Sequence, residues 1–186
     1  EIKECDWSSD VCSSDLDGWR AIIADTYTIK NVQIMSQAVA DYLGRGKRIA
    51  IGYDTRFMSG IFAQKAAEVF AHNGIEVILS DRPTPTPTLS FAVKTHKLDL
   101  GVMITASHNP PEYNGMKFVR DHSKPISADT GLKTIEQMCL KGEFTKSSTP
   151  GTVQEIQVAP DYVKHILTYV DVTQLKPFKV VVNSGN

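Results

Sequence analysis

Short apolar runs alternate with longer segments of helical periodicity along most of the chain. Between positions 31 and 44 apolar residues recur three or four apart, which predicts an amphipathic helix capped by Asn31 and ended by Gly44. Residues 48–53 lack that spacing and predict a short buried strand. The further predicted elements are a helix capped by Ser59 and stopped at Asn73-Gly74, strands at 75–79, 98–105, 116–119 and 178–183, and helices at 89–96, 127–140 and 162–170.

Strands that alternate with amphipathic helices are typical of layered α/β proteins. The pattern predicts a three-layer α/β/α domain with a mixed, mostly parallel sheet over residues 17–141. Asn114-Gly115 is a turn signal, so the strand that follows it is expected to run antiparallel. Residues 142–158 gather Gly, Lys, Ser, Thr and Pro and predict a linker or exposed loop, after which 159–186 would begin an incomplete second domain.

The first sixteen residues stand apart from this pattern. They have neither helical nor strand periodicity, and they lack the long apolar core of a signal peptide. Residues 1–16 resemble a translated sequencing adapter and are expected to be foreign to the natural protein. The open alternative is a natural, disordered and acidic N-terminus.

Charge and cysteine content narrow the class of protein. The chain has 20 Lys and Arg against 21 Asp and Glu; residues 1–16 hold one Lys and five acids, which leaves 19 against 16. Without a clustered basic stripe, neither nucleic acid nor a membrane is an expected partner. Cys139 is the single cysteine after residue 16, so neither disulfides nor a metal knuckle are expected, and the cytoplasm is the expected compartment.

The candidate chemistry lies in residues 101–119, where an apolar strand stops at Ser107. Open α/β sheets carry their sites beyond the carboxyl ends of strands. The flanks of Ser107 lack the Gly-x-Ser-x-Gly of a hydrolase elbow. His108 would point away from Ser107 if the segment were extended. These features favour Ser107 as a phosphate carrier over Ser107 as a hydrolase nucleophile.

A phosphoserine carries about two negative charges near neutral pH and needs cationic neighbours. The sequence offers Arg20, Arg56 and Lys117, and both arginines follow or adjoin predicted strand ends. Arginine suits bidentate phosphate contacts. Ordinary surface charge is the alternative interpretation of all three.

The segment Thr105-Ala106-Ser107-His108-Asn109-Pro110, followed by Asn114-Gly115-Met116-Lys117, resembles the phosphoserine loop of the α-D-phosphohexomutases, the phosphoglucomutase and phosphomannomutase family. Three further segments agree with this family in order. They are Asp17-Gly18-Trp19-Arg20, Gly52-Tyr53-Asp54-Thr55-Arg56 and Pro83-Thr84-Pro85-Thr86. Together they resemble the first domain of such a mutase and the start of its second.

The resemblance implies a mechanism. Phosphorylated Ser107 would pass its phosphoryl group to a hexose phosphate. The bound hexose 1,6-bisphosphate would then reverse its orientation, and the other phosphate would return to Ser107. Arg20 would steady the phosphoserine, Asn109 would orient the loop, and His108 or Lys117 would handle the hydroxyl proton. Arg56 and Lys117 are further candidates for phosphate binding, and a phosphate oxygen on Ser107 would be one ligand of Mg²⁺.

The chain also departs from the family pattern. It has no Asp-x-Asp-x-Asp-Arg metal loop, no later sugar-recognition or phosphate-binding loop, and no Phe-Gly-Thr before Asp17. We therefore expect an inactive fragment cut at both ends, from a parent that acts on glucose or mannose phosphates. The alternatives are a phosphoglucosamine-type mutase, a non-catalytic sugar-phosphate-binding α/β module and a serine hydrolase.

Overall fold

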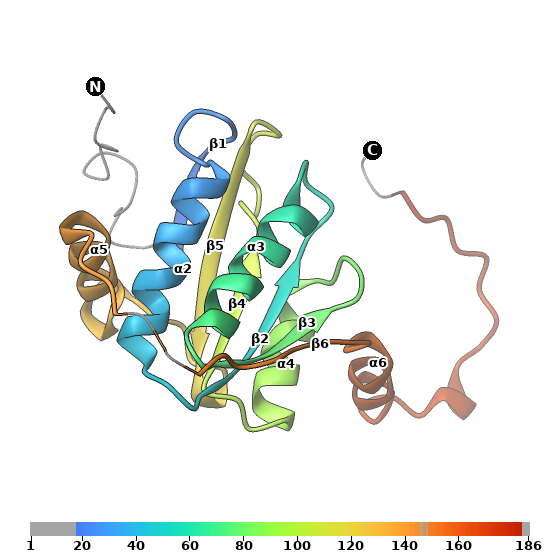
Figure 1. Cartoon of the computed structure of the whole chain (residues 1–186). Helices are drawn as coiled ribbons and strands as arrows, with labels where there is room; N and C mark the ends of the chain where they lie inside the picture. The colour runs from blue at the N-terminus through green and yellow to red at the C-terminus, as the bar shows by residue number, and fades with distance from the viewer. Residues whose placement is uncertain (1–17, 146, 148, 184–186) are drawn as a thin grey trace.

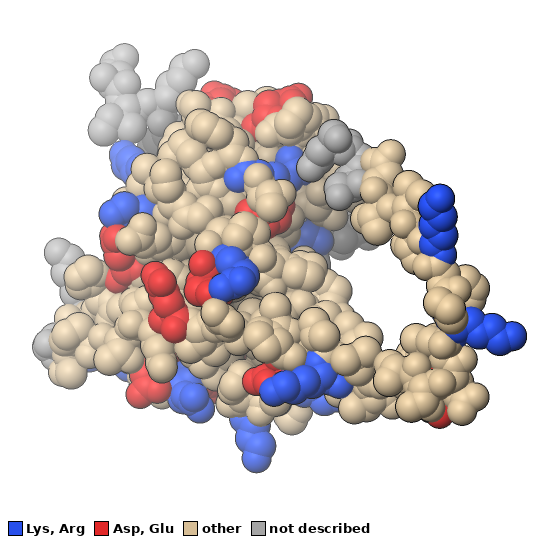
Figure 2. Space-filling view, turned by 90° about the vertical axis from the view of Figure 1, so that its right-hand side faces the viewer, with Lys and Arg blue, Asp and Glu red and all other residues tan. Residues whose placement is uncertain are grey.

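The computed structural model describes residues 18–145, 147 and 149–183. Residues 1–16, interpreted above as adapter, lie outside the described part, as does Asp17. None of the helices in the described ranges is long and apolar enough to cross a membrane. On the face shown in Figure 2, basic and acidic side chains are interspersed.

A six-stranded sheet forms the middle of the molecule (Figure 1). Its order is β1-β5-β4-β2-β3-β6. Parallel pairs join β4 to β2, β2 to β3 and β3 to β6, whereas β5 runs antiparallel to both β4 and β1. This confirms the predicted mixed, mostly parallel sheet. The strands are β1 (Gly18–Ile22), β2 (Arg48–Tyr53), β3 (Glu76–Ser80), β4 (Leu100–Ile104), β5 (Tyr113–Arg120) and β6 (Val153–Ile156).

Helices cover both faces of the sheet, which confirms the three-layer architecture. On one face lie α2 (Ile29–Leu43), α3 (Ser59–His72) and α5 (Leu132–Lys141); α4 (Thr86–Thr95) lies on the other (Figure 1). The last helix, α6 (Ala159–Leu167), packs on α4 through Phe91, whose ring lies 4.8 Å from that of His165. Short 3-10 turns are η1 (Asp121–Ser123), η2 (Ala128–Thr130) and η3 (Val172–Gln174).

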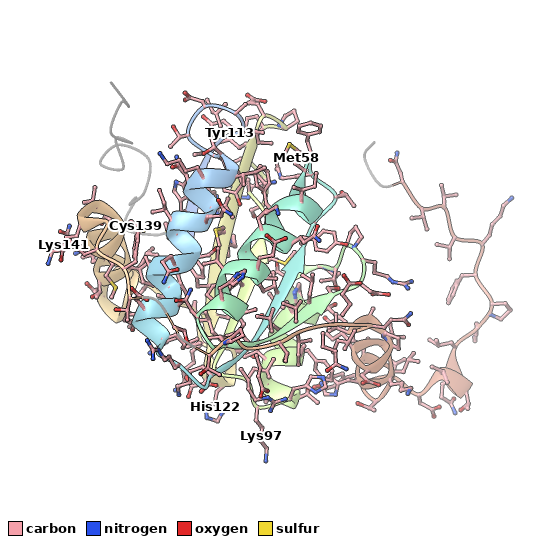
Figure 3. The ribbon with its side chains drawn as sticks, viewed as in Figure 1. Met58, Lys97, Tyr113, His122, Cys139 and Lys141 are labelled. Atoms are coloured by element: carbon pink, nitrogen blue, oxygen red, sulfur yellow. The ribbon has the colours of Figure 1, made fainter. Side chains whose placement is uncertain are left out.

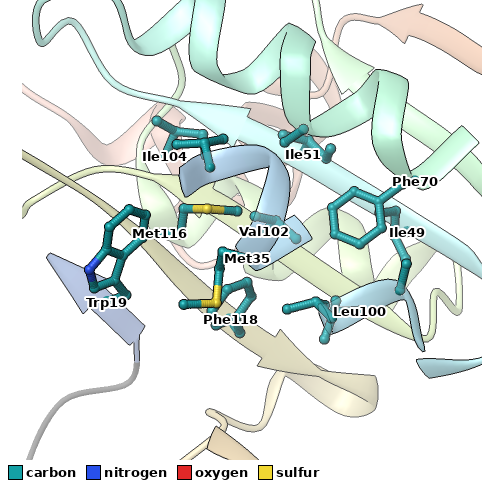
Figure 4. Packing of buried hydrophobic residues seen from close by; sticks show 14 of the residues in the cluster. Trp19, Met35, Ile49, Ile51, Phe70, Leu100, Val102, Ile104, Met116 and Phe118 are labelled. Carbon is teal, nitrogen blue, oxygen red and sulfur yellow. The ribbon is translucent and has the colours of Figure 1, made fainter. Parts of the chain in front are cut away.

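The alternation of side chains along each strand divides the core into two clusters. Met116 and Phe118 of β5 face α2, where they meet Met35 in the larger cluster (Figure 4). Met103 of β4 packs with Leu89 of α4 in the smaller cluster on the opposite face. Both faces of β4 are therefore buried, which explains its unbroken apolar sequence.

The first helix begins earlier than predicted. Its N-cap is Thr28, whose Oγ1 accepts from the backbone N–H of Asn31 at 3.2 Å, so Asn31 lies inside the first turn. The amide of Asn31 donates instead to the carbonyl of Thr26 at 2.7 Å. Both residue types can cap a helix. The predicted end at Gly44 is confirmed by a φ of +85°, which favours glycine.

Asn114-Gly115 was predicted as a turn and is instead part of β5, paired with Ala21 and Arg20. The chain turns before it, where the N–H of Tyr113 donates to the carbonyl of Pro110 at 3.1 Å. The antiparallel direction of this strand is as predicted. The turn signal failed because buried polar contacts, described below, hold Asn114 inside the strand.

The segment 142–158, predicted as linker or exposed loop, contains the edge strand β6. The backbone just before it is tied to the domain, because the N–H of Gly151 donates to the carbonyl of Ala71 at 2.7 Å. A Cβ at Gly151 would lie 2.1 Å from the carbonyl oxygen of Ile75, so a glycine permits this approach. The composition of this segment predicted a loop, whereas the pairing of β6 with β3 shows that part of it is a strand.

The strand predicted at 178–183 does not form, and these residues extend away from the sheet (Figure 1). Phe178, Val180, Val181 and Val182 are 73–88% exposed. A parallel strand needs neighbours on which to pair. The assignment of 159–186 to a second domain remains a prediction.

Replacing Phe118 with alanine should destabilise the fold by about 3–5 kcal/mol, because the ring is fully buried between sheet and helix. Phe57→Ala is the matched control, since Phe57 is 70% exposed and its loss should cost less than about 0.5 kcal/mol. Equilibrium urea unfolding measures both changes. Equal losses in the two variants would contradict this description of the core.

Burial, with a smaller contribution from the Glu136 carboxylate, raises the pKa of the Cys139 thiol to about 12. The thiol therefore ionises more easily in the unfolded chain, and its contribution to stability is complete below about pH 9 and lost toward pH 12. At pH 8 alkylation of Cys139, followed by peptide mapping, should be about 10³-fold slower in the folded chain than in urea. Equal rates in both conditions would show an accessible thiol.

Candidate functional site

Ser107 follows the carboxyl end of β4, one of the two central strands of the sheet, and its side chain is exposed. The parallel strands β2 and β3 end at the same edge of the sheet. Figure 3 shows Met58 and Tyr113 at this edge and Lys97 and His122 at the opposite one. Loops that are distant in sequence therefore converge around Ser107.

The backbone of Ser107 is left-handed, with a φ of +57°. Its N–H donates to Oγ1 of Thr105 at 2.9 Å, and the N–H of Asn109 donates to the carbonyl of Ala106 at 3.1 Å. Ala106 itself is completely buried. The loop is thus a tight turn that is anchored at Ala106 and presents Ser107 to solvent.

His108 does not point away from Ser107, as an extended segment would require. Its Nδ1 lies 3.3 Å from Oγ of Ser107. The prediction failed because Ser107 is left-handed rather than extended. Within the described ranges no hydrogen bond or ion pair joins a carboxylate to His108.

Arg20 reaches the loop from β1. Its neighbour Trp19 is buried in the larger cluster, so Arg20 emerges on the opposite face of the sheet. Nη1 of Arg20 donates to Oδ1 of Asn109 at 2.9 Å. Gly115 lies directly across from Arg20, and a Cβ there would lie 2.9 Å from Cγ of Arg20. The side chain of Arg20 can therefore cross the strand.

Lys117 lies two residues beyond Gly115 and so shares its face of β5. It pairs with Gly18 of β1 on one side and Met103 of β4 on the other. Arg20 and Lys117 are thus diagonal neighbours on one face. This places two cationic side chains on one face of the sheet, Lys117 on the strand next to β4 and Arg20 one strand further away.

The guanidinium of Arg56 is engaged by the protein. Nη1 donates to the carbonyls of Pro110 (2.8 Å) and Tyr113 (3.0 Å), and Nη2 donates to those of Ser107 (3.0 Å) and Asn109 (2.5 Å). The sequence placed Arg56 near the site as a phosphate-binding candidate. The structure places it against the backbone of the loop.

A polar cluster next to Arg56 was not anticipated from the sequence. Ser59 was predicted to cap α3, but the N-cap position is Met58, with a φ of +60°, and no side chain caps the helix. Oγ of Ser59 donates to Oδ1 of Asp54 at 2.8 Å and accepts from Nδ2 of Asn114 at 2.9 Å. The hydroxyl is therefore used by the cluster. The only sequence signal near this cluster is the family-like segment Asp54-Thr55-Arg56.

A magnesium site is only partly represented in the described residues. Mg²⁺ takes six oxygen ligands in near-octahedral geometry. Within 18–145, 147 and 149–183, no three His, Cys, Asp or Glu side chains gather where they could hold a metal. A phosphate on Ser107 would add a single ligand, so these residues do not fit the ion by themselves.

Comparison with known proteins identifies the domain. Residues 15–146 match the family model for the alpha/beta/alpha domain I of phosphoglucomutase/phosphomannomutase. A phosphomannomutase of Vibrio cholerae serotype O1 is 41% identical over 140 residues, which cover 75% of this chain and 30% of that protein. A phosphomannomutase of Escherichia coli is 38% identical over 155 residues, which cover 82% of this chain and 34% of that protein.

Solved structures give the same result. A crystal structure from Thermus thermophilus, assigned as a phosphomannomutase, superposes with a TM-score of 0.75 at 30% identity and covers 89% of this chain and 37% of that one. The fold and the matched segment therefore define a phosphohexomutase domain I. The chain belongs to the phosphoglucomutase/phosphomannomutase family. It spans about a third of the length of these relatives.

Gly115→Ala should destabilise the chain by about 3 kcal/mol or more, because the new Cβ would lie 2.6 Å from the carbonyl oxygen of Trp19 and 2.7 Å from that of Thr105. Gly60→Ala is the control, since its nearest neighbour, on Tyr53, is at an ordinary 3.4 Å. The control should stay within about 1 kcal/mol of the parent. Urea unfolding of both variants measures the difference, and equal losses would contradict the close approach at Gly115.

Proposed function

We propose that this chain is the phosphoserine domain of an enzyme that interconverts the 1- and 6-phosphates of a hexose, glucose or mannose, with Ser107 as the phosphoryl carrier. The observation that carries the proposal is the exposed Ser107 hydroxyl on a tight loop tied to Arg20 through Asn109, inside a segment that matches domain I of this family. Phosphoryl transfer depends mainly on positioning and charge stabilisation, and such a loop supplies positioning.

In the proposed reaction a hydroxyl oxygen of the hexose phosphate attacks the phosphorus of phosphorylated Ser107. The bond between phosphorus and Oγ breaks, a bond to the sugar oxygen forms, and the hydroxyl proton passes to a base. In the second half-reaction Oγ of Ser107 loses its proton and attacks the other phosphorus of the hexose 1,6-bisphosphate, the bond from that phosphorus to the sugar oxygen breaks, and the sugar oxygen takes up a proton. Arg20 would offset the negative charge on the phosphoserine, at a site where Asn109 fixes the position of its guanidinium.

His108 is proposed to exchange the proton on Oγ of Ser107. The 3.3 Å between Nδ1 and Oγ supports this role, because proton transfer requires a hydrogen-bonded pair. Histidine also changes its charge near neutral pH more readily than lysine. Lys117 is proposed to contribute positive charge from the neighbouring strand.

The rest of the enzyme is proposed to lie in further sequence. The chain spans about a third of its curated relatives, so sugar recognition and the remaining ligands of Mg²⁺ would come from other domains. We propose a cytoplasmic parent enzyme. The 186-residue chain by itself is expected not to turn over.

The test is a coupled assay with glucose 1-phosphate and mannose 1-phosphate on the product of the complete reading frame that contains this chain. Ser107→Ala should lower kcat by about 10⁴-fold or more, because it removes the phosphoryl acceptor. Ser123→Ala is the matched control, since Ser123 also has a left-handed backbone, with a φ of +61°, but follows β5 at the other end of the sheet. Activity that survives Ser107→Ala would overturn the proposal, and Ser107-dependent turnover by the 186-residue chain alone would contradict its expected inactivity.

A further inference from the structure

The contacts of Arg56 use its whole guanidinium group. An arginine has five N–H donors in a planar fork. Four of them point at the carbonyls of Ser107, Asn109, Pro110 and Tyr113. The fifth, on Nε, faces Oδ2 of Asp54 at 3.5 Å. Every donor of this side chain therefore has a partner within the protein.

Four carbonyls that converge on one cation fix the peptide planes that carry them. The carbonyl of Ser107 belongs to the peptide that joins it to His108, and the carbonyl of Asn109 to the peptide that joins it to Pro110, so Arg56 restrains the loop backbone on both sides of the His108–Asn109 peptide. The same contact supports the left-handed backbone of Ser107, which costs a non-glycine residue about 1–3 kcal/mol.

We infer that Arg56 is a positioning residue, which holds the phosphoserine loop by its backbone and does not bind phosphate. The catalytic part of this inference rests on the proposed function. The structural part, that Arg56 holds the loop backbone, rests only on its hydrogen bonds. Arg20 differs from Arg56, because it donates to a side-chain oxygen, Oδ1 of Asn109. Arg20 remains the arginine proposed to meet the phosphate.

Asp54 orients Arg56. Its Oδ1 accepts from the backbone N–H of Arg56 at 3.0 Å and from Oγ of Ser59 at 2.8 Å, while Oδ2 faces Nε. The side chains of Arg56 and Asp54 are 16% and 24% exposed, so packing restricts the pair. Asn114 completes the cluster by donating to Ser59 and by accepting, through Oδ1, from the N–H of Gly115 at 2.8 Å. The cluster thus joins the end of β2 and the start of β5 to the start of α3.

Lysine cannot replace arginine in this arrangement. Its three donors share one nitrogen and cannot reach four separate carbonyls in a plane. A phosphate contact, in contrast, depends largely on positive charge, which lysine keeps. The pair of variants Arg56→Lys and Arg56→Gln therefore separates the two roles.

The first experiment measures amide hydrogen exchange by NMR in the 186-residue chain. In both Arg56 variants the amides of Ser107 and Asn109 should exchange about tenfold faster or more, because several charge-assisted hydrogen bonds to the loop are lost. Arg48→Gln is the matched control: Arg48 pairs with Glu76 at 3.4 Å at the other end of β2, and its loss should leave these amides unchanged. Parental exchange rates in Arg56→Lys would overturn the inference.

If an Arg56 variant fails to fold, Asp54→Asn provides the same test. It keeps the guanidinium but removes the carboxylate that orients it, so the amides of Ser107 and Asn109 should again exchange faster, by about threefold or more. Unchanged exchange in a folded Asp54→Asn chain would overturn the inference.

The second experiment places phosphoserine at position 107 by genetic encoding and follows its titration by ³¹P NMR. A positioning role predicts that Arg56→Lys already moves the titration midpoint, because the loop is displaced although the positive charge is kept. A midpoint that Lys preserves and Gln shifts would identify Arg56 as a phosphate ligand and overturn the inference. Failure of the mutase assay would leave the exchange result intact, so the two proposals can fail separately.

Discussion

The placement of β5 between β4 and β1 is the constraint on which the rest of the site depends. β4 delivers Ser107 to the edge of the sheet, and β1 carries Arg20, which lies 89 residues before Asn109 in sequence. The two strands have no direct pairing. Their separation is set by β5, which pairs antiparallel with both, and Gly115 lets the three backbones and the stem of Arg20 pass close together. Core packing of Met116 and Phe118 fixes the register of β5, because a slip by one residue would bring Gly115 and Lys117 into the core.

A hydrogen-bond network at the junction of β2 and α3 also positions the site. Asp54, Ser59 and Asn114 form a partly buried chain of hydrogen bonds, and Arg56 extends it to the backbone of the loop. Buried polar groups must be satisfied, and a fully connected network restricts each member to one orientation. Packing of the apolar core sets the register of the strands. The hydrogen-bond network sets the orientation of individual peptide groups in the loops next to the strands.

The sequence was sufficient to predict the layers of the fold and the mixed sheet. Apolar periodicity is a strong signal, and it identified 48–53 as a strand with the bounds that the structure shows. It was insufficient where one residue type can play two roles. Ser59 can cap a helix or serve a buried carboxylate, and Asn114 can form a turn or donate within a strand. In both cases the choice was made by contacts from distant parts of the chain. β6 was missed for a similar reason, because an edge strand of mixed composition is recognised by its pairing with β3.

At position 107 the left-handed backbone and the proposed chemistry favour different amino acids. Glycine adopts such a φ without a steric penalty, so on grounds of folding alone residue 107 would favour glycine. A phosphoryl carrier requires a hydroxyl, which glycine lacks. In the proposed role the loop would keep a serine at this left-handed position, where Arg56 donates to its carbonyl oxygen. The residue proposed for catalysis is serine, whereas the residue that would best stabilise this backbone is glycine. The trade-off between stability and activity is therefore confined to one residue.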